Sequence, residues 1–496
     1  MLQMPFFFQL FGVASLAMYF PSAHALSVEN FAQARSFFYT GTLGLFFLFM
    51  VTLATSNRQL EETGIQQLVS LALGLFLLPL YLAIPEYDSV RTIYFLNAYL
   101  DMVSALTTTG FVIFEPDRLS ETLHLWRSLV AWLGGALIWL AAVAILAPLN
   151  LGGFEVASSK RIHQRQFLTT LERRMLMRRN FAALFPIYGG LTAILWIALT
   201  ILGLPGFDSL IFAMSILATS GITATRALSD FDASLTVELI IVLFLTLALT
   251  RGLIARERVA AGVVGFSTRA ELKIARVVIL GAVILLTLHQ LIEIGNSEST
   301  FFHMKTVRMI WSNLFTVISF LTTHGWPSNY WDASQKWSEF STPGLLFLGL
   351  VLVGGGVATT AGGIKLLRVY ALYANAVQEM DRLVHPSSIG QTRSVSQGEL
   401  RSKAFIAWIF FMLFFIALAG VTLLLAASGL NFETAFVVAI SALSTTGPLV
   451  EMVLNAPIDF ATLGVVAKLT LSFAMVLGKL EVLVLLGLFT SETWRG

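Results

Sequence analysis

The sequence predicts an all-α polytopic membrane protein in which a unit of long helix, short helix with a loop, and long helix occurs four times. Composition is the first of two observations that predict this class. Of 496 residues, 56% are hydrophobic and 12% are charged, whereas a soluble domain carries about twice that share of charge. The second observation is a short motif ending in glycine that recurs four times in register, as expected for an internal repeat.

Composition also excludes several function classes. The net charge is only +2, so nothing favours nucleic-acid binding. The chain has no cysteine, which excludes disulfides, thiolate metal sites and cysteine nucleophiles. Its seven histidines form no His-Glu-x-x-His pair, and no Gly-x-Gly-x-x-Gly opens a helix after a strand. No catalytic dyad or metal set is visible inside the apolar segments, so we expect neither an enzyme nor a bound cofactor.

The repeated motif becomes visible when the chain is aligned on four glycines. Two positions before each glycine stands threonine, four before it leucine, and six before it serine. Thirteen positions before each glycine stands a residue that favours a helix N-cap. We therefore expect each copy to be a capped helix of roughly two to three turns that ends in a Thr/Gly loop. The glycines are Gly110, Gly221, Gly325 and Gly447, and the expected caps are Asn97, Asp208, Ser312 and Thr434.

Ten apolar segments are long enough to cross a bilayer core, which takes about 20 residues. We expect them near 5–25, 36–55, 64–84, 123–149, 180–203, 234–255, 275–296, 342–375, 403–428 and 460–492. The apolar helices before the four glycines are too short to span and suit re-entrant helices. The first two long segments precede the repeats. The predicted units are an N-terminal two-helix hairpin at 1–60 and repeats at 61–152, 153–258, 259–385 and 386–496.

The N-terminal segment has two interpretations. Ala23-His24-Ala25 follows an apolar stretch and resembles a signal-peptidase site, so cleavage there is one alternative. No Lys or Arg precedes the apolar stretch, however, and the positive n-region of a signal peptide is therefore missing. We expect the segment to be retained as a membrane helix.

Basic residues cluster in the three connections between repeats, near 151–180, 251–276 and 365–403. All three connections lie on one side of the membrane, which the positive-inside rule identifies as cytoplasmic. The short helices and their loops then enter from the outside.

The four loops carry the groups that a cation pathway needs. A short helix ending inside the membrane directs its carbonyl end, with roughly half a negative charge, toward the centre. Irregular backbone is tolerated at this depth where it lines a pathway, and glycine permits the torsion angles of an extended loop. Small-residue helix packing is the alternative, but it does not explain a capped short helix before every copy. The candidate filter residues are Thr107, Thr108, Thr109, Gly110, Ala218, Thr219, Ser220, Gly221, Thr322, Thr323, His324, Gly325, Ser444, Thr445, Thr446 and Gly447.

Further motifs make the chain similar to the Trk/Ktr/HKT superfamily of potassium transporters, in particular its TrkH-type bacterial branch. The resemblance covers nearly the whole chain. Besides the four loops, it rests on Trp126-Arg127-Ser128-Leu129 with Trp132-Leu133-Gly134-Gly135, on Ala361-Gly362-Gly363-Ile364-Lys365 and on Leu477-Gly478-Lys479-Leu480-Glu481.

The resemblance implies a central pseudo-fourfold pore in each subunit, a homodimer in the bacterial inner membrane, and a cytosolic nucleotide-binding RCK ring as regulator. Glycine at all four loop positions, as here, goes with potassium selectivity in the family, whereas serine in the first loop of some plant relatives goes with sodium transport. We therefore expect potassium as the transported ion. The expected potassium-coordinating residues are Thr108, Thr109, Thr219, Ser220, Thr323, His324, Thr445 and Thr446.

Two residues depart from the family pattern. His324 stands where a small or hydroxyl residue is more usual. A protonated imidazole there would repel cations and make transport pH-sensitive, but we favour a histidine turned away and hydrogen-bonded behind the filter. Lys479 stands where relatives commonly carry arginine, which keeps the charge but loses the bidentate hydrogen-bonding geometry.

The glycine-rich stretch 354–363 interrupts the second long span of the third repeat, because so many glycines break a helix. In related transporters this break forms an intramembrane loop that blocks permeation beneath the filter; a kink without function is the alternative. Lys365 is expected near the inner membrane surface, where snorkelling is easy. The candidate gate residues are Gly355, Gly356, Thr359, Thr360, Gly362, Gly363, Lys365 and Lys479.

Charged residues in the last apolar segment must face protein or water. We expect Lys468 to lie deeper than the others, and Lys479 to lie close to the gating loop and to oppose cation passage when that loop is closed. Lys479 and Glu481 are two positions apart and do not share a helix face, so they need different partners.

The leading hypothesis is a potassium-translocating pore subunit gated by a cytosolic partner. A potassium symporter coupled to protons or sodium, or a less selective potassium/sodium transporter, is the alternative. His324 and a few buried charges are the only coupling candidates that the sequence offers.

Overall fold

The computed structural model describes residues 5–55, 64–90, 92–149, 151, 153, 170–223, 228, 231, 235–249, 264–294, 302–338, 343–384, 394–454 and 458–481. Every regular element within these ranges is a helix, which confirms the all-α class. Seven of the helices are long and apolar enough to cross a membrane. The molecule is therefore a polytopic helical membrane protein.

Two membrane spans form the N-terminal hairpin. The first comprises α1 (Phe6–Ala17) and α2 (Tyr19–Ser27), and the second is α3 (Phe31–Thr55). α1 packs against α3 and α4, and the Tyr81 hydroxyl of α4 lies 3.0 Å from Ser15 Oγ and donates to the Thr40 carbonyl. His24 Nδ1 lies 3.0 Å from Thr122 Oγ1 of α6. The segment thus packs as part of the bundle, while its retention stays a prediction.

The four repeats follow in chain order, and their helices include most of the predicted spans. The first repeat contains α4 (Gly64–Val90), α5 (Phe95–Leu106), α6 (Glu121–Ala141), a π-helical turn at Ala142–Leu146 and α7 (Ala147–Leu149). The second contains α9 (Thr170–Ile201), α10 (Gly206–Ala218), α11 (Leu235–Leu245) and a 3-10 turn at Thr246–Leu249. The third contains α12 (Val264–Ile294), α13 (Phe302–Leu321), α14 (Trp331–Ser338), α15 (Gly344–Val353) and α16 (Leu366–Val384), and the fourth contains α17 (Ser394–Ala427), α18 (Phe432–Leu443), α19 (Leu449–Val453) and α20 (Val465–Leu480). Short 3-10 turns at Pro116–Arg118 and Phe460–Thr462 precede α6 and α20.

Three of the predicted spans are shorter than expected over the described residues. The span predicted at 234–255 is helical over Leu235–Leu249, and the one at 460–492 is helical over Val465–Leu480; residues 250–255 and 482–492 lie outside the described residues. The span predicted at 342–375 ends at Val353 and resumes as α16 at Leu366. The glycines between them break the helix as predicted.

The short helices α5, α10 and α18 have 12, 13 and 12 residues and agree with the repeat motif. The third copy does not, because α13 has 20 residues and Ser312 lies inside it. The expected N-caps are wrong in every copy: the caps of the other three are Tyr94, Pro205 and Asn431.

A physical reason accounts for this shift. The helices begin three residues earlier than predicted, so Asn97, Asp208 and Thr434 occupy their first turn. A polar or acidic residue is also favourable there, next to the positive end of the helix dipole. Asn97 Nδ2 instead donates across the bundle to the Ala461 carbonyl at 3.3 Å.

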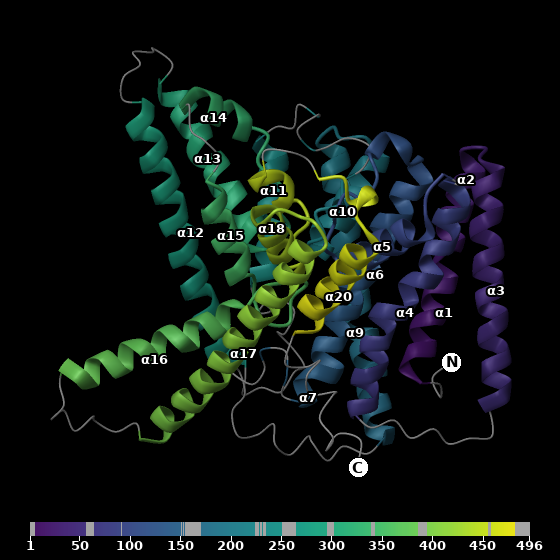
Figure 1. Cartoon of the computed structure of the whole chain (residues 1–496), viewed down its shortest axis with the longest axis horizontal. Helices are drawn as coiled ribbons and strands as arrows, with labels where there is room; N and C mark the ends of the chain where they lie inside the picture. The colour runs from purple at the N-terminus through teal and green to yellow at the C-terminus, as the bar shows by residue number, and fades with distance from the viewer. Residues whose placement is uncertain are drawn as a thin grey trace.

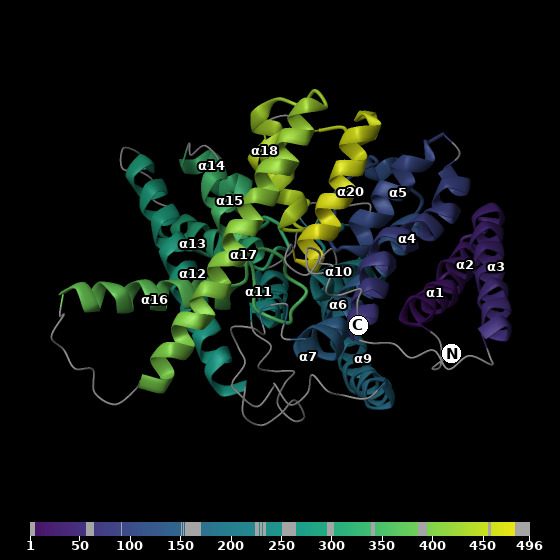
Figure 2. The same ribbon diagram turned by 60° about the horizontal axis from the view of Figure 1, so that its bottom comes forward.

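The four repeats pack into a ring. α6 of the first repeat packs on α10 of the second, α11 on α13, α15 on α18, and α20 of the last repeat returns to α5 of the first. Figure 2 shows these groups of helices following one another around the molecule, with α4 and α5 beside α20. The loops after α5, α10, α13 and α18 are therefore brought toward one centre.

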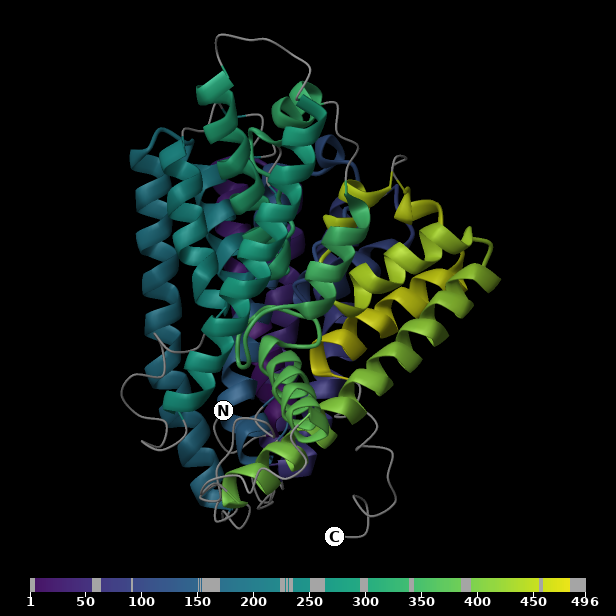
Figure 3. The ribbon, with the colours of Figure 1, turned by 90° about the vertical axis from the view of Figure 1, so that its left-hand side faces the viewer.

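The helices that follow the three connections between repeats all begin at one end of the molecule. Figure 1 shows α9, α12 and α17 all starting at its lower end, where α16 runs sideways across the direction of α12. This agrees with the shared side that the basic residues predict, and the cytoplasmic identity of that side stays a prediction. Figure 3 shows the irregular segment between α15 and α16 in the interior, beside α17 and α20.

Candidate ion pathway and the loop beneath it

The helices before the four loops, α5, α10, α13 and α18, end in the same backbone motif. Each passes into its loop through a threonine with positive φ: 56° at Thr108, 50° at Thr219, 58° at Thr323 and 53° at Thr445. The following N–H donates to the carbonyl of the motif serine, as in a Schellman cap. Glycine is the usual residue at this position, and a β-branched residue there costs on the order of 1–3 kcal/mol. The four bonds are Thr109 to Ser104 at 2.8 Å, Ser220 to Ser215 at 3.0 Å, His324 to Ser319 at 2.9 Å and Thr446 to Ser441 at 2.9 Å.

Three of these threonines contact the glycine-rich loop, which we define as residues 354–365. Thr219 Oγ1 donates to Thr360 Oγ1 at 3.0 Å. Thr323 Oγ1 accepts the Gly362 N–H at 2.9 Å. A Cβ on Gly362 would lie 2.6 Å from Thr445 Oγ1. The hydroxyls of Thr219 and Thr323 explain why threonine rather than glycine stands at these two strained positions, because glycine could not make these hydrogen bonds to the loop.

The fourth threonine is held by Lys479, near the C-terminal end of α20. Lys479 Nζ donates to Thr108 Oγ1 at 2.5 Å and to the Thr360 carbonyl at 2.7 Å. The prediction that Lys479 lies close to the glycine-rich loop is therefore confirmed. The side chain is buried and joins the loop directly to the first short helix. All four threonines thus lie beside the glycine-rich loop or beside Lys479, which is bonded to that loop.

The four loop glycines pack loop against loop around the ring. Three of them have positive φ, at 75° for Gly110, 65° for Gly221 and 88° for Gly325. Each lies against a neighbouring loop, so that an added Cβ would overlap or crowd these groups: the Ser220 carbonyl at Gly110, the His324 carbonyl at Gly221, Thr446 Cγ2 at Gly325 and the Gly110 carbonyl at Gly447. Glycine is required here for two reasons: the loops approach each other closely, and a positive φ is rarely adopted by other residues.

The fourth glycine differs from the other three. Unlike the other three, Gly447 does not have a positive φ. Its N–H donates to the Thr109 carbonyl at 2.5 Å, so one carbonyl of the first loop is bonded to the fourth loop rather than free toward the axis. The fourfold arrangement is therefore approximate at the backbone level.

His324 is buried, but the hydrogen bond expected behind its loop is not found. Among the described residues, neither ring nitrogen has a hydrogen-bond partner. The ring instead packs edge-on against Trp326, with ring centroids 4.4 Å apart. Trp326 Nε1 in turn donates to the Gly221 carbonyl at 2.8 Å. The imidazole is thus held by an aromatic contact within the third loop, and Trp326 links that loop to the second.

The glycine-rich loop is also anchored from the side. The Gly356 N–H donates to the Ala248 carbonyl at 3.0 Å, and the Val357 N–H to Glu271 Oε1 at 3.1 Å. Within the loop, Thr359 Oγ1 donates to the Gly356 carbonyl at 2.7 Å. Gly354 and Gly363 have φ of 70° and 78°, which other residues rarely adopt. Of the predicted gate residues, Gly355, Gly356, Thr359, Thr360 and Gly362 are buried and Gly363 is half-buried.

Two lysines lie elsewhere than predicted. Lys365 does not snorkel to the surface: it is buried and donates to the Ala361 carbonyl of the glycine-rich loop. Lys468 is not the deeper lysine of the last span, because it lies in the first turn of α20 and donates to the Ala461 carbonyl at 2.7 Å. Lys479, fourteen residues from the start of that helix, is the one that reaches the centre. The length of an apolar segment does not show which end of that span lies toward the centre of the ring of repeats.

Glu481 and Lys479 have different partners, as predicted. Glu481 pairs with Arg368 of α16 at 2.5 Å, and the Arg368 guanidinium also lies 3.7 Å from the centroid of the Phe410 ring. The end of α20 is thereby tied to the helix that follows the glycine-rich loop.

Several buried acidic residues were not singled out from the sequence. Glu238 of α11 accepts from Trp311 Nε1 at 2.6 Å, from Ser328 Oγ at 2.9 Å and from the Asn329 N–H at 2.7 Å, which braces the segment after the third loop. Asp101 in the first short helix pairs with Arg127 of α6 at 2.7 Å. A charge inside an apolar segment is itself a signal, and it would have found both carboxylates.

Comparisons with known proteins agree on one family. The family described as "TrkH: Cation transport protein" matches residues 76–493. The Trk system potassium uptake protein TrkI of Halomonas elongata is 29% identical over 422 residues, covering 84% of this chain and 80% of that protein. The Trk system potassium uptake protein TrkH of Salmonella typhimurium is 26% identical over 405 residues, covering 80% of this chain and 79% of that protein.

A solved structure has the same fold. The crystal structure of the potassium transporter TrkH from Vibrio parahaemolyticus superposes with a TM-score of 0.78 at 24% identity, covering 100% of this chain and 99% of that chain.

Proposed function

This chain belongs to the TrkH family of cation transport proteins, and we propose that it carries potassium into the cell through a selectivity filter formed by its four Thr/Gly loops. The relatives are named as potassium uptake proteins of the Trk system. The observation that carries the proposal is the ring itself: four capped loops, one from each repeat, meet with glycine at every contact. The proposed potassium ligands are the loop carbonyls and hydroxyls, because carbonyl rings replace the hydration shell of a cation.

We further propose that the glycine-rich loop is a gate and that the structure has it closed. Support comes from its hydrogen bonds to threonines of two different repeats and from Lys479, which bridges it to Thr108. A cation that left the filter would meet this loop and the Lys479 ammonium group. The repeats at 61–152, 153–258, 259–385 and 386–496 would each supply one wall of the pathway, and 1–60 would remain outside it.

The regulatory partner and the oligomer are also proposals. The word "system" in the relatives' names and the resemblance to the Trk/Ktr/HKT superfamily support a cytosolic RCK-type nucleotide-binding regulator, a homodimer, and a bacterial inner-membrane location. α16, which follows the gate and whose Arg368 pairs with Glu481 at the end of α20, is the element through which such a regulator would pull on the loop.

Proton coupling is the second candidate function, and His324 is the observation that favours it. The imidazole is buried in the third loop and its nitrogens have no partner among the described residues. A symporter predicts potassium uptake driven by a pH gradient and lost in His324→Phe, which keeps the aromatic contact with Trp326. A channel predicts uptake that is insensitive to the gradient.

Cation flux through the purified protein in liposomes tests the filter. We expect potassium and rubidium to pass and sodium and lithium to be excluded, whereas Gly110→Ser admits sodium and conducts potassium poorly. The added side chain would overlap the Ser220 carbonyl and so displace the second loop. Equal sodium and potassium flux in the wild-type protein would overturn the selectivity proposal. If the protein alone shows no cation flux, the measurement is repeated with the regulator added.

A further inference from the structure

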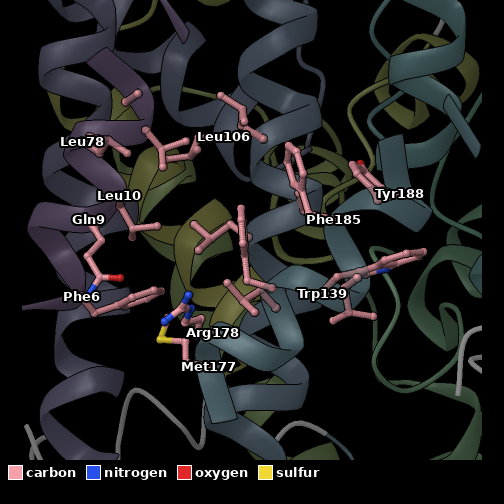
Figure 4. Close-up of a pocket in the computed structure, with 18 of the residues that line it drawn as sticks. Phe6, Gln9, Leu10, Leu78, Leu106, Trp139, Met177, Arg178, Phe185 and Tyr188 are labelled. Atoms are coloured by element: carbon pink, nitrogen blue, oxygen red, sulfur yellow. The ribbon is translucent and has the colours of Figure 1, made fainter. Parts of the chain in front are cut away.

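An apolar cavity of about 620 Å³ lies between the N-terminal hairpin and the first two repeats. Its walls come from α1, α4, α6 and α9, and the end of α5 contributes Leu106 (Figure 4). This volume falls within the range of roughly 300–1,000 Å³ that ligand sites occupy. The cavity stands apart from the pathway loops: Leu106 borders both, but no residue of the four loops or of the glycine-rich loop lines it.

The position of the cavity makes it accessible to lipid. α1 packs against α3 and α4, whereas α9 packs against α6 and α10, so among the described helices neither pair covers the space between α1 and α9. Val13 of α1 and Met175, Phe181 and Phe185 of α9 line the cavity and are exposed. On a membrane-spanning helix such side chains face acyl chains.

The charged side chain of the cavity lies at one end. Figure 4 shows Phe6, Met177 and Arg178 at one end of the cavity and Leu78 and Leu106 at the other. Arg178 lies near the start of α9, at the end of the molecule that the basic connections predict to be cytoplasmic. Among the described residues that line the cavity, Arg178 carries the only charge.

We propose that the cavity binds one anionic phospholipid of the inner leaflet, with its phosphate on Arg178 and an acyl chain running toward Leu106. An acyl chain gains little by leaving other chains for an apolar wall, so the headgroup contact must decide which lipid binds. A guanidinium offers bidentate hydrogen bonds to a phosphate. Basic pockets between membrane helices on the cytoplasmic side suit anionic headgroups.

The far end of the cavity reaches the first filter loop. Leu106 is the last residue of α5, directly before Thr107. Gly134 of α6 packs so closely behind it that a Cβ there would overlap the Leu106 carbonyl. A chain seated against Leu106 therefore supports the base of the first loop, which predicts that lipid binding also raises thermal stability.

Native mass spectrometry of the delipidated full-length protein in detergent tests the proposal, with dioleoyl phosphatidylglycerol and dioleoyl phosphatidylcholine as probes. We expect one phosphatidylglycerol to bind more tightly than phosphatidylcholine. Arg178→Gln should weaken phosphatidylglycerol binding about fivefold, the effect of one basic residue near the membrane surface. Ala136→Trp, which fills the cavity from α6, should abolish it. Arg179→Gln is the matched control, because Arg179 is also exposed but does not line the cavity.

Four results would overturn the proposal. They are equal binding of the two lipids, equal losses in Arg178→Gln and Arg179→Gln, tight binding that survives Ala136→Trp, and competition by glycerol 3-phosphate at the same concentration as the lipid. The last would show that a headgroup suffices without the cavity. None of these measurements depends on transport, so their failure is distinguishable from failure of the proposed function.

Discussion

Replacing Lys479 by methionine should open a leak. In the structure Lys479 Nζ holds both Thr108 Oγ1, at 2.5 Å, and the Thr360 carbonyl, at 2.7 Å. Methionine keeps much of the side-chain length and removes the charge and both hydrogen bonds. We expect basal potassium flux, in the absence of any regulator, to rise.

The magnitude follows from the distances. A cation bound to Thr108 Oγ1 would lie about 5 Å from the ammonium group, where two unit charges repel by about 3 kcal/mol at an effective dielectric constant of 20. Removing that barrier corresponds to roughly a hundredfold increase in flux. The remaining hydrogen bonds of the glycine-rich loop, from Gly362 to Thr323 and between Thr360 and Thr219, still hold it in place. We therefore expect an increase between about tenfold and a hundredfold.

Potassium or rubidium efflux from liposomes measures this effect. Lys468→Met is the matched control, because it removes a buried lysine from the same helix whose partner is the Ala461 carbonyl rather than the glycine-rich loop. Lys479→Arg keeps the charge and should stay closed. Unchanged or lower flux in Lys479→Met protein that elutes and melts like the wild type would refute the reasoning, as would an equal leak in Lys468→Met.

Two further predictions concern the gate contact and a brace of the third loop. Gly362→Ala should raise basal flux, because its Cβ would overlap the Ser444 carbonyl and push the glycine-rich loop away. Gly349→Ala is the control and should leave flux unchanged, because its Cβ would meet open space. Unchanged basal flux in Gly362→Ala would argue against gating by this contact. Glu238→Gln should lower the melting temperature in detergent by the equivalent of about 1.5–3 kcal/mol, the worth of hydrogen bonds to a charged group, because the amide nitrogen cannot accept from Trp311 Nε1. The exposed Glu433→Gln should melt like the wild type, and equal melting of the two variants would contradict the bracing role.

Much of the fold was predictable because its signals are local. A transmembrane class follows from the share of apolar residues, and the four loops are found from a motif that spans only a few positions. The break in the third repeat also follows from consecutive glycines. These features depend on the torsional preferences of neighbouring residues and on the length of apolar segments, and both can be read from the sequence.

The helix starts were wrong because they were predicted from the residue type at the cap. At the fourth helix two residues, Asn431 and Thr434, qualify as caps by type, whereas Tyr94 and Pro205, the caps of the first two helices, do not. In α5, α10 and α18 the helix begins three residues before the expected start. α13 continues well before Ser312 and packs against α11, α12 and α14, which are contacts that cap type does not encode.

The sequence by itself determined the class of the protein, the position of four loops and the place where a helix must break. The tertiary structure alone decided which side chains meet at the centre. Lys479 and Thr108 are 371 positions apart, and Glu238 reaches Ser328 across 90. Contacts of this kind form only when the four repeats close into a ring. The sequence pattern within one repeat does not show which residues of a different repeat it will contact.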